Sequence, residues 1–320
     1  MKQILSVLPI NENQKKQLQQ AAKKVNANIV FSSYENVTEA DVQNSGCVIG
    51  NANPDFFQNA TKVKWLQTNS AGTDQYIAKG ILPEGTILTN ATGAYGTAVS
   101  EHMLATTLMI IKNLHLYRDN QNKSSWKKFG SVSSLKDATV LIIGAGDIGL
   151  HYAKLVKLLG SYTIGVRRRA FTKPAFLDEL HLSDEIDNLL PRADIVASIL
   201  PGTVDTEKFF TARRFSLMKK SAVFLNTGRG SAVDQDALYY ALKNHVIAAA
   251  SIDVTTPEPL PASSPLWSLP NLVLTPHISG GFHLNETMDN IVNIACQNID
   301  NFFNNKTMIN EVDFTTGYRK

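Results

Sequence analysis

Three residues whose types could do chemistry lie in separate segments of the chain: Arg229 in NTGRG, Glu258 in TTPEPLP and His277 in TPHISG. Moving a hydride between a nicotinamide ring and a carbonyl carbon requires a proton donor at the carbonyl oxygen. Histidine suits that role because it titrates near neutrality. A carboxylate such as Glu258 on the far imidazole nitrogen would fix the tautomer and stabilise the imidazolium. The planar guanidinium of Arg229 could hold a substrate carboxylate. The set predicts hydride transfer to a 2-ketoacid that contacts both Arg229 and His277.

A glycine pattern, GAGDIG, precedes these residues and is typical of a dinucleotide-binding turn. Gly144 would permit the tight turn after a strand, Gly146 would let the backbone approach a pyrophosphate, and Gly149 would allow close packing of helix on strand. Amides at the start of the helix would then meet the phosphates. Asp147 is unusual there, since it adds negative charge, although a carboxylate in a first turn favours the helix dipole. A tight connection without a ligand would use the same glycines.

The strand after this helix determines which nicotinamide cofactor is expected. A unit that binds NAD would end this strand in an acid, which accepts hydrogen bonds from the ribose hydroxyls. Here YTIGV runs instead into Arg167, Arg168 and Arg169. A guanidinium can pair with a ribose 2′-phosphate, so Arg167 and Arg168 predict NADP in preference to NAD. A solvated basic turn after the strand is the alternative.

Short apolar runs alternate with longer amphipathic stretches in two series, which predicts an α/β protein with two doubly wound parallel sheets. The strands of the first series are expected at 3–8, 28–31, 47–49, 65–68 and 86–89. Those of the second series are expected at 139–146, 162–166, 195–200, 222–226, 248–254 and 271–276. Helices are expected at 12–25, 98–117 and 283–303.

Composition excludes several other classes of protein. The chain has 320 residues, enough for two domains. Its net charge of +3 is too small for a nucleic-acid surface, and no apolar run approaches the length of a membrane span. Cys47 and Cys296 lie far apart without metal-ligand spacing, so we expect no metal and a reducing, cytoplasmic compartment. The apolar run at the start turns polar by Asn11 and is interpreted as a strand, not a signal peptide.

These motifs together resemble a known family, the D-isomer-specific 2-hydroxyacid dehydrogenases, which includes glyoxylate and hydroxypyruvate reductases and phosphoglycerate dehydrogenases. The segments that carry the resemblance are WLQTNSAGTDQY (65–76), AVSEHMLA (98–105), VLIIGAGDIG (140–149), LPGTVDTEKFF (200–210), FLNTGRGSAVDQDAL (224–238), DVTTPEPLPASSPLW (253–267) and LTPHISGG (274–281). In that family an Arg, a Glu and a His in these contexts are catalytic, which implies the same for Arg229, Glu258 and His277. The remaining histidines, His102 among them, lack the TPHISG context and are expected to be structural or on the surface.

The resemblance also implies an architecture and further contacts. A Rossmann cofactor domain (99–283) would be inserted into a flavodoxin-like substrate domain (1–98 and 284–320), with dimers formed through the cofactor domains. The loop at Ala71 and Gly72 would bind the substrate carboxylate. Cofactor contacts beyond the glycines and arginines already named are expected at Asp147, Ile148, Leu200, Pro201, Thr206, Thr227, Gly228, Asp253 and Gly280.

Two other functions share this fold. Transcriptional corepressors related to the family would sense a nucleotide without needing turnover; the complete set of Arg229, Glu258 and His277 argues against that alternative. Formate dehydrogenases would be expected to carry glutamine where this chain has Glu258. The sequence therefore favours an enzyme that reduces glyoxylate, hydroxypyruvate or a related small 2-ketoacid.

Overall fold

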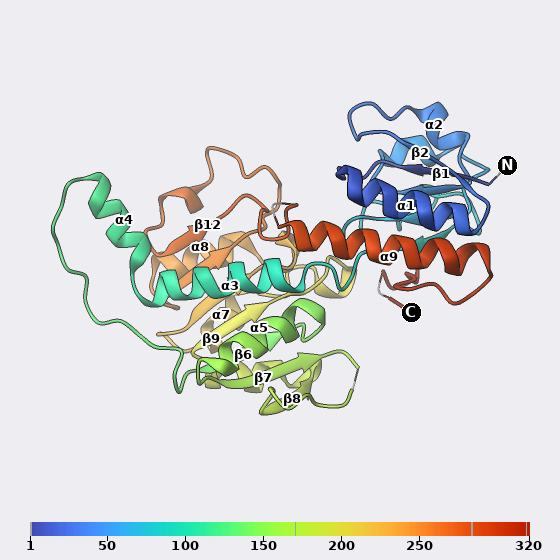
Figure 1. Ribbon diagram of the computed structural model, residues 1–320. Coiled ribbons are helices and arrows are strands. Elements are labelled where there is room, and N and C mark those ends of the chain that lie inside the picture. The colour runs from blue at the N-terminus through green and yellow to red at the C-terminus, as the bar shows by residue number, and fades with distance from the viewer. Residues whose placement is uncertain (1, 170, 283, 318) are drawn as a thin grey trace. The chain divides into compact units, whose positions relative to one another are not determined.

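The structure is a computed structural model that describes residues 2–169, 171–282, 284–317 and 319–320. The chain forms two compact units (Figure 1). Unit 1 comprises Met1–Tyr95 and Phe282–Lys320, and unit 2 comprises Gly96–Gly281. Each unit has its own parallel sheet and its own cluster of buried apolar side chains.

The sheet of unit 1 confirms the first predicted series. Its strands are β1 (Gln3–Ser6), β2 (Asn28–Phe31), β3 (Cys47–Ile49), β4 (Trp65–Gln67) and β5 (Ile87–Thr89). They pair in the order β2-β1-β3-β4-β5, all parallel, which is the flavodoxin-like order of a doubly wound sheet. The helices of this unit are α1 (Glu12–Lys24), α2 (Glu39–Gln43), the 3₁₀ turn η1 (Pro54–Phe57) and α9 (Asn285–Phe303).

Helix α9 brings the C-terminal part of the chain back to unit 1, where it lies beside α1 (Figure 1). Asn11 begins α1 with a capping box, in which its side chain accepts from the Gln14 amide. The Gln14 side chain also donates to Asp289 of α9 at 2.7 Å. Farther along α9, the buried Asn298 donates to Gln67 at the end of β4, at 2.8 Å. A residue far along the chain thereby links α9 to the carboxyl end of β4.

The sheet of unit 2 contains the strands of the second series and one more. The strands are β6 (Thr139–Ile143), β7 (Tyr162–Arg167), β8 (Glu179–Leu182), β9 (Ile195–Ser198), β10 (Val223–Asn226), β11 (Ala249–Ile252) and β12 (Leu272–Leu274). Their order, β12-β11-β10-β9-β6-β7-β8, is that of a Rossmann sheet, and the order reverses between β6 and β9. Ligands of such sheets bind at the carboxyl ends of the strands near this reversal. The predicted fold class is therefore confirmed.

Helices and 3₁₀ turns connect these strands. They are α3 (Gly96–Ile111), α4 (Leu114–Asn122), α5 (Asp147–Leu158), η2 (Ser183–Glu185), α6 (Ile186–Leu189), η3 (Leu190–Arg192), η4 (Val204–Thr206), α7 (Ala212–Leu217), η5 (Gly230–Ala232), α8 (Gln235–Lys243) and η6 (Pro265–Ser268). Helix α3 packs along α5. Three buried aromatic rings, Phe210, Phe215 and Phe224, fill the core beneath α7, with centroids 4.7 to 6.1 Å apart.

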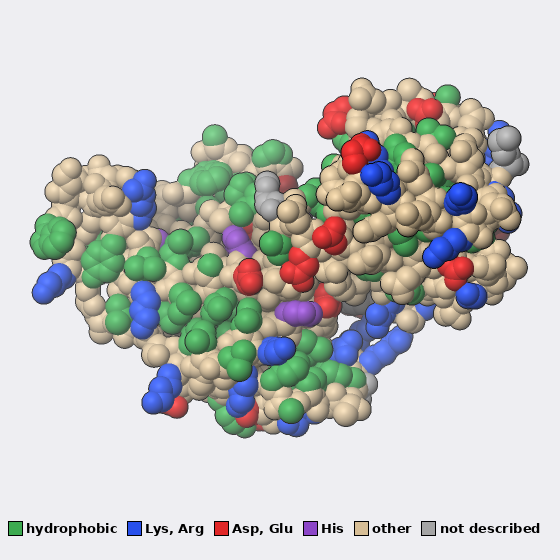
Figure 2. All heavy atoms as spheres, viewed as in Figure 1, with side chains coloured by type: hydrophobic (Ala, Val, Ile, Leu, Met, Phe, Trp, Pro, Cys, Tyr) green, Lys and Arg blue, Asp and Glu red, His purple; other side chains and the backbone are tan. Residues whose placement is uncertain are grey.

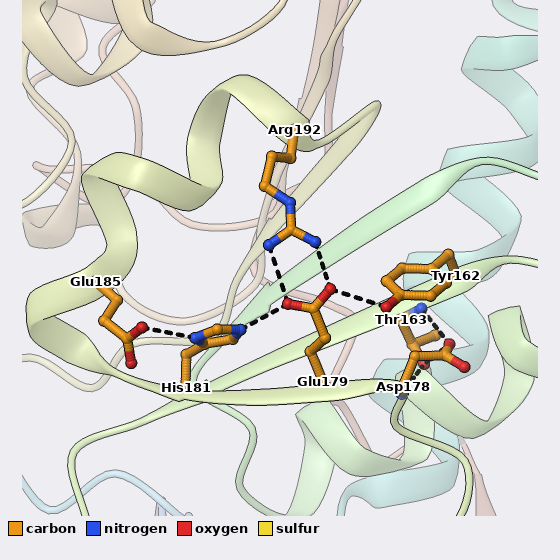
Figure 3. Close-up of polar contacts among 7 residues, drawn as sticks. All are labelled: Tyr162, Thr163, Asp178, Glu179, His181, Glu185 and Arg192. Carbon is orange, nitrogen blue, oxygen red and sulfur yellow. Dashed lines mark hydrogen bonds and ion pairs between the residues drawn. The ribbon is translucent and has the colours of Figure 1, made fainter.

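One sequence prediction about unit 2 was wrong, and one strand was missed. The single helix expected over 98–117 is divided into α3 and α4, because Asn113 adopts a left-handed conformation with φ of 57°. Strand β8 was not predicted, since its polar residues resemble a loop. Its side chains form the polar cluster in Figure 3, where Glu179 accepts from Tyr162 of β7 and from Arg192 of η3. Contacts made across the fold, not local apolar pattern, hold this edge strand.

No helix among the described residues combines the length and the apolar character that crossing a membrane requires. Within the same residues, no group of three or more His, Cys, Asp or Glu side chains is arranged to hold a metal ion.

Candidate active site

The imidazole of His277 contacts the carboxylate of Glu258 in unit 2. The Nδ1 atom of His277 lies 2.8 Å from Oε2 of Glu258, and the Thr255 amide donates to Oε1 of the same carboxylate at 2.9 Å. Two contacts therefore orient the carboxylate. The His277 and Glu258 side chains remain 47% and 37% exposed, so a small molecule could reach the ring. With Nδ1 turned to Glu258, Nε2 is the nitrogen that could exchange a proton with a substrate.

Asp253 shapes the loop that carries His277. Its carboxylate accepts hydrogen bonds from the amides of Ile278 (2.9 Å) and Ser279 (3.0 Å) and from the Thr275 hydroxyl (2.6 Å). Its backbone carbonyl accepts from the His277 amide at 2.7 Å. These bonds hold His277 at φ of 53°, a left-handed conformation that non-glycine residues rarely adopt. Asp253 is only 2% exposed, and both carboxylate oxygens are engaged within the loop.

The segment of Arg229 lies against the segment of Glu258. Arg229 follows β10, and its side chain donates to the Gly228 carbonyl at 3.0 Å. The next residue is Gly230, where an added Cβ would lie 2.0 Å from the Thr255 carbonyl oxygen. Only a glycine permits so close an approach of the two backbones. Because Thr255 also holds Glu258, the fold brings the Arg229, Glu258 and His277 segments together within unit 2.

The glycine fingerprint connects β6 to α5. Gly144 has φ of 98°, and a Cβ there would lie 2.6 Å from the Ile199 carbonyl oxygen. At Gly149 a Cβ would lie 2.4 Å from the Gly144 carbonyl oxygen, so helix and turn are in close contact. Around Gly146, the N-cap residue of α5, an added Cβ would meet no heavy atom within 4 Å among the described residues. The first and third glycines are thus needed for packing, and the second leaves open space at the helix N-terminus.

Two buried hydroxyl groups lie at the carboxyl ends of neighbouring strands. The Oγ atoms of Ser198, which ends β9, and Thr227, which follows β10, find no hydrogen-bond partner among the residues that the structure describes. Thr227 was expected to contact the cofactor, whereas Ser198 was missed. A serine inside the apolar run IVASIL was the available signal. Buried hydroxyls without partners are uncommon, so both are suited to a polar ligand.

The loop after β9 is fixed by its own hydrogen bonds. The Thr206 hydroxyl contacts the Pro201 carbonyl at 2.5 Å and accepts from the Thr203 amide at 3.0 Å. Thr206 is 6% exposed, so its hydroxyl serves the loop in this structure. The Leu200 backbone packs on Gly228, where an added Cβ would lie 2.3 Å from the Leu200 carbonyl oxygen.

The remaining expected cofactor contacts occupy the start of α5 and the loop of His277. Asp147 is the first residue of α5, and its Oδ1 lies 3.5 Å from Nδ1 of His151 on the next turn. That histidine is a cationic partner for Asp147 whenever it is protonated. Ile148 is half-buried beside Asp147, and Gly280 is half-buried after Ser279.

Arginines end β7 where an acid would serve NAD. The Arg167 guanidinium carbon lies 4.3 Å from the centroid of the Phe171 ring, a cation–π distance. Arg168 is exposed beside it. The next acid along the chain is Asp178, and its carboxylate accepts from Lys157 at 2.7 Å. No carboxylate therefore follows Arg167 on this turn.

The substrate loop predicted in unit 1 is held by its own polar groups. The Ala71 carbonyl accepts from the Asn90 side chain at 2.9 Å, and the Gly72 carbonyl accepts from the Ser70 hydroxyl at 2.6 Å. These bonds give the loop a defined shape at the carboxyl end of β4.

Comparison with known proteins decides the family. Residues 104–279 match the NAD binding domain of the D-isomer specific 2-hydroxyacid dehydrogenases. The chain belongs to this family. A glyoxylate/hydroxypyruvate reductase B from Pectobacterium atrosepticum is 31% identical over 258 residues, which cover 78% of this chain and 79% of the relative.

Solved structures agree with this assignment over nearly the whole chain. A D-isomer specific 2-hydroxyacid dehydrogenase family protein from Aeromonas salmonicida has a TM-score of 0.85 and 30% identity, covering 98% of this chain and 99% of the other. A family member from Xanthobacter autotrophicus, in complex with NADPH and MES, has a TM-score of 0.82 and 25% identity, covering 99% of each chain. The resemblance drawn from the motifs is confirmed, and the protein is an NAD(P)-dependent dehydrogenase.

A nicotinamide dinucleotide fits the residues of this dehydrogenase. The space at Gly146 adjoins the N-terminus of α5, whose amides favour a phosphate. The Ser198 and Thr227 hydroxyls offer hydrogen bonds at the carboxyl ends of β9, which borders the reversal of strand order, and of its neighbour β10. These features support a nicotinamide cofactor in unit 2.

Proposed function

We propose that the protein reduces a small 2-ketoacid, of the glyoxylate or hydroxypyruvate kind, to the D-2-hydroxyacid. The observation that carries this proposal is the contact between His277 and Glu258, 2.8 Å long, beside the segment of Arg229. An acid–base pair next to a guanidinium is the arrangement that reduction of a carbonyl beside a carboxylate requires. The glyoxylate/hydroxypyruvate reductase relative supports the size of the substrate.

His277 acts as the general acid in this proposal. A reduced nicotinamide bound in unit 2 would be the source of the hydride for the carbonyl carbon. The C=O double bond becomes a single bond, and the imidazolium of His277 gives its Nε2 proton to the oxygen, so that an alcohol forms. Glu258 stabilises the imidazolium through Nδ1 before the transfer. In the oxidative direction the neutral ring takes the same proton back.

Arg229 orients the substrate in this proposal. Two parallel N–H donors of its guanidinium would hold the substrate carboxylate, an arrangement that the single ammonium of a lysine cannot reproduce. We propose that the domain of residues 1–98 and 284–320 is the substrate domain and supplies the Ala71–Gly72 loop. The domain of residues 99–283 would bind the dinucleotide.

NADP is the proposed cofactor, in preference to NAD. The support is the pair Arg167 and Arg168 at the end of β7, where no carboxylate follows on the same turn. Either guanidinium could pair with a ribose 2′-phosphate, and Phe171 gives Arg167 a surface to pack on. The relative from Xanthobacter autotrophicus, solved with NADPH, agrees with this choice.

A homodimer formed through the cofactor domains is the proposed assembly. No residue of α4 is buried, and Leu114, Trp126 and Val132 are 52%, 102% and 53% exposed. Figure 2 has hydrophobic side chains gathered over the face of unit 2 that carries α3 and α5. Leu158, the last residue of α5, is 76% exposed. Exposed apolar surface of this kind is typical of a protein–protein interface. Light scattering of the wild type and of Leu114→Asp would test this assembly.

The cytoplasm is the proposed compartment, since both cysteines are free thiols as in reducing surroundings. The alternative of a nucleotide-sensing regulatory protein draws no support from the relatives. Initial rates over a panel of 2-ketoacids, each with NADPH and with NADH, test the proposal as a whole. Reduction of glyoxylate or hydroxypyruvate with a preference for NADPH would support it. A protein that binds NADPH but reduces none of the panel would contradict it.

A further inference from the structure

A short chain of hydrogen bonds leads from helix α3 to the loop of His277. The Thr275 hydroxyl lies 2.6 Å from Oδ1 of Asp253 and 3.3 Å from Nε2 of His102. A carboxylate oxygen only accepts, so the single hydroxyl proton of Thr275 goes to Asp253. The Thr275 oxygen must then accept from His102, which therefore carries a proton on Nε2. The order of donation is His102 to Thr275 to Asp253.

The environment of His102 favours the neutral form of this donor. His102 is half-buried on α3, and burial lowers the pKa of its imidazole, against the opposing effect of the Asp253 charge. A neutral imidazole has one N–H, and the geometry assigns it to Nε2. His102 thus donates its single N–H to the Thr275 hydroxyl. The sequence offered no functional context for this histidine.

We propose that His102 and Thr275 are positioning residues for His277 and act through Asp253. This inference rests on the proposed function, in which His277 is the acid. Thr275 fixes the rotation of the Asp253 carboxylate, and the carboxylate in turn holds the amides of Ile278 and Ser279. Those amides follow His277 directly, so the chain of bonds maintains the left-handed backbone that presents its ring.

Matched substitutions test the hydroxyl and the imidazole separately. Thr275→Val keeps the shape but removes the hydroxyl, whereas Thr275→Ser keeps it. His102→Leu removes the donor, whereas His102→Gln retains an amide N–H near the position of Nε2. Thr107→Val is the control, because it removes a buried hydroxyl on the same helix that lies 2.9 Å from the Tyr152 hydroxyl.

Two readouts are measured in the full-length protein. One is amide hydrogen exchange of the segment 276–281 without cofactor, and the other is kcat and KM for the 2-ketoacid. Thr275→Val and His102→Leu are expected to speed exchange and lower kcat by about three- to tenfold, the effect of one net hydrogen bond. KM for the 2-ketoacid should stay within about twofold, because Arg229 is untouched. Thr275→Ser and His102→Gln should recover most of both losses.

The outcomes are distinguishable. Unchanged exchange and kcat in Thr275→Val and His102→Leu would overturn the proposal, as would equal losses in Thr275→Ser and Thr275→Val. Thr107→Val should lower Tm without altering either readout. If it reproduced the losses, general destabilisation would be their cause and the positioning role would be wrong. If the wild type reduced no 2-ketoacid, the proposed function would fail, while hydrogen exchange would still test the loop.

Discussion

His277 Nδ1 and Glu258 Oε2 lie 2.8 Å apart, and the Thr255 amide holds the other carboxylate oxygen at 2.9 Å. The carboxylate is therefore fixed in orientation, and it selects which imidazole nitrogen faces away from it. Since Glu258 contacts the ring, its substitution should act on the reaction through His277. Substitution of His277 itself should remove the proton donor.

His277→Asn is expected to lower kcat for 2-ketoacid reduction by about 100- to 10,000-fold, the usual contribution of a positioned general acid. The dissociation constant for NADPH, measured by fluorescence titration, should change little, because the ring contacts no residue of the glycine fingerprint among the contacts described for it. Near-native turnover across the whole pH range would eliminate His277 as the donor.

Glu258→Gln is expected to lower kcat for 2-ketoacid reduction by about tenfold or more, because the neutral amide no longer gives the imidazolium a charge-assisted hydrogen bond at Nδ1. Steady-state kinetics measure this loss. Glu12→Gln is the matched control, because Glu12 forms a surface pair with Lys15 on α1. An unchanged kcat in Glu258→Gln would show that the contact with Glu258 does not support His277 as the acid.

Arg229→Lys is expected to raise KM for the 2-ketoacid by about tenfold or more and to lower kcat, since an ammonium keeps the charge but loses the paired donors. Steady-state kinetics measure both. Arg213→Lys is the control, because Arg213 pairs with Asp187 on the surface, and its KM should match that of the wild type. A normal KM in Arg229→Lys would assign substrate orientation to another residue.

Much of the fold could be predicted because its strands are apolar runs separated by amphipathic helices. The exceptions have physical causes. Strand β8 has the polar residues Glu179 and His181, whose side chains pair with Arg192 and Glu185. Sequence periodicity does not reveal such contacts. The division between α3 and α4 depends on Asn113, a residue type that tolerates a left-handed backbone without requiring it.

The site could be predicted only where a residue type and its motif specify one role. The His277–Glu258 contact was expected from chemistry and family context, and the structure contains it. The engagement of Asp253 with the loop was not predicted, because it depends on amide directions that form only in the folded state. Likewise, nothing in the sequence separates His102 from a surface histidine; its contact with Thr275 depends on how α3 packs beside β11.

Arg167→Asp is expected to lower the ratio of kcat/KM with NADPH to kcat/KM with NADH by about tenfold or more, the effect of losing one charge-assisted contact. The introduced carboxylate should repel a 2′-phosphate and accept hydrogen bonds from ribose hydroxyls. Lys220→Asp is the control. It makes the same change in charge just before β10, near the amino ends of the strands and away from their carboxyl ends. An NADH-preferring wild type, or an unchanged ratio in Arg167→Asp, would contradict the proposed preference.

The polar cluster of Glu179, His181, Glu185 and Arg192 on and beside β8 is expected to stabilise the fold most within a limited range of pH (Figure 3). His181 lies between two carboxylates, with Nε2 2.7 Å from Glu179 and Nδ1 2.8 Å from Glu185, so both nitrogens carry protons when both contacts are hydrogen bonds. Arg192, aided by His181 and Tyr162, lowers the pKa of Glu179 to about 2. Glu179, aided by Glu185, raises the pKa of His181 above its ordinary value of 6.5.

The sign of each contribution follows from linkage. Because folding lowers the pKa of Glu179, its ionised carboxylate stabilises the fold fully above pH 4.5, the ordinary pKa. This stabilisation is lost as the pH falls toward about 2. Because folding raises the pKa of His181, its protonated ring stabilises the fold fully below pH 6.5, the ordinary pKa. This stabilisation is lost as the pH rises through the pKa of the folded state. His181→Asn should therefore lower Tm most near about pH 5.5 and progressively less toward about pH 9. Thermal unfolding across this range measures the difference. His115→Asn is the control, because that ring contacts the Met109 carbonyl and no carboxylate is among the partners described for it. An equal loss of Tm at both pH values would mean that His181 stabilises β8 by packing and not by charge.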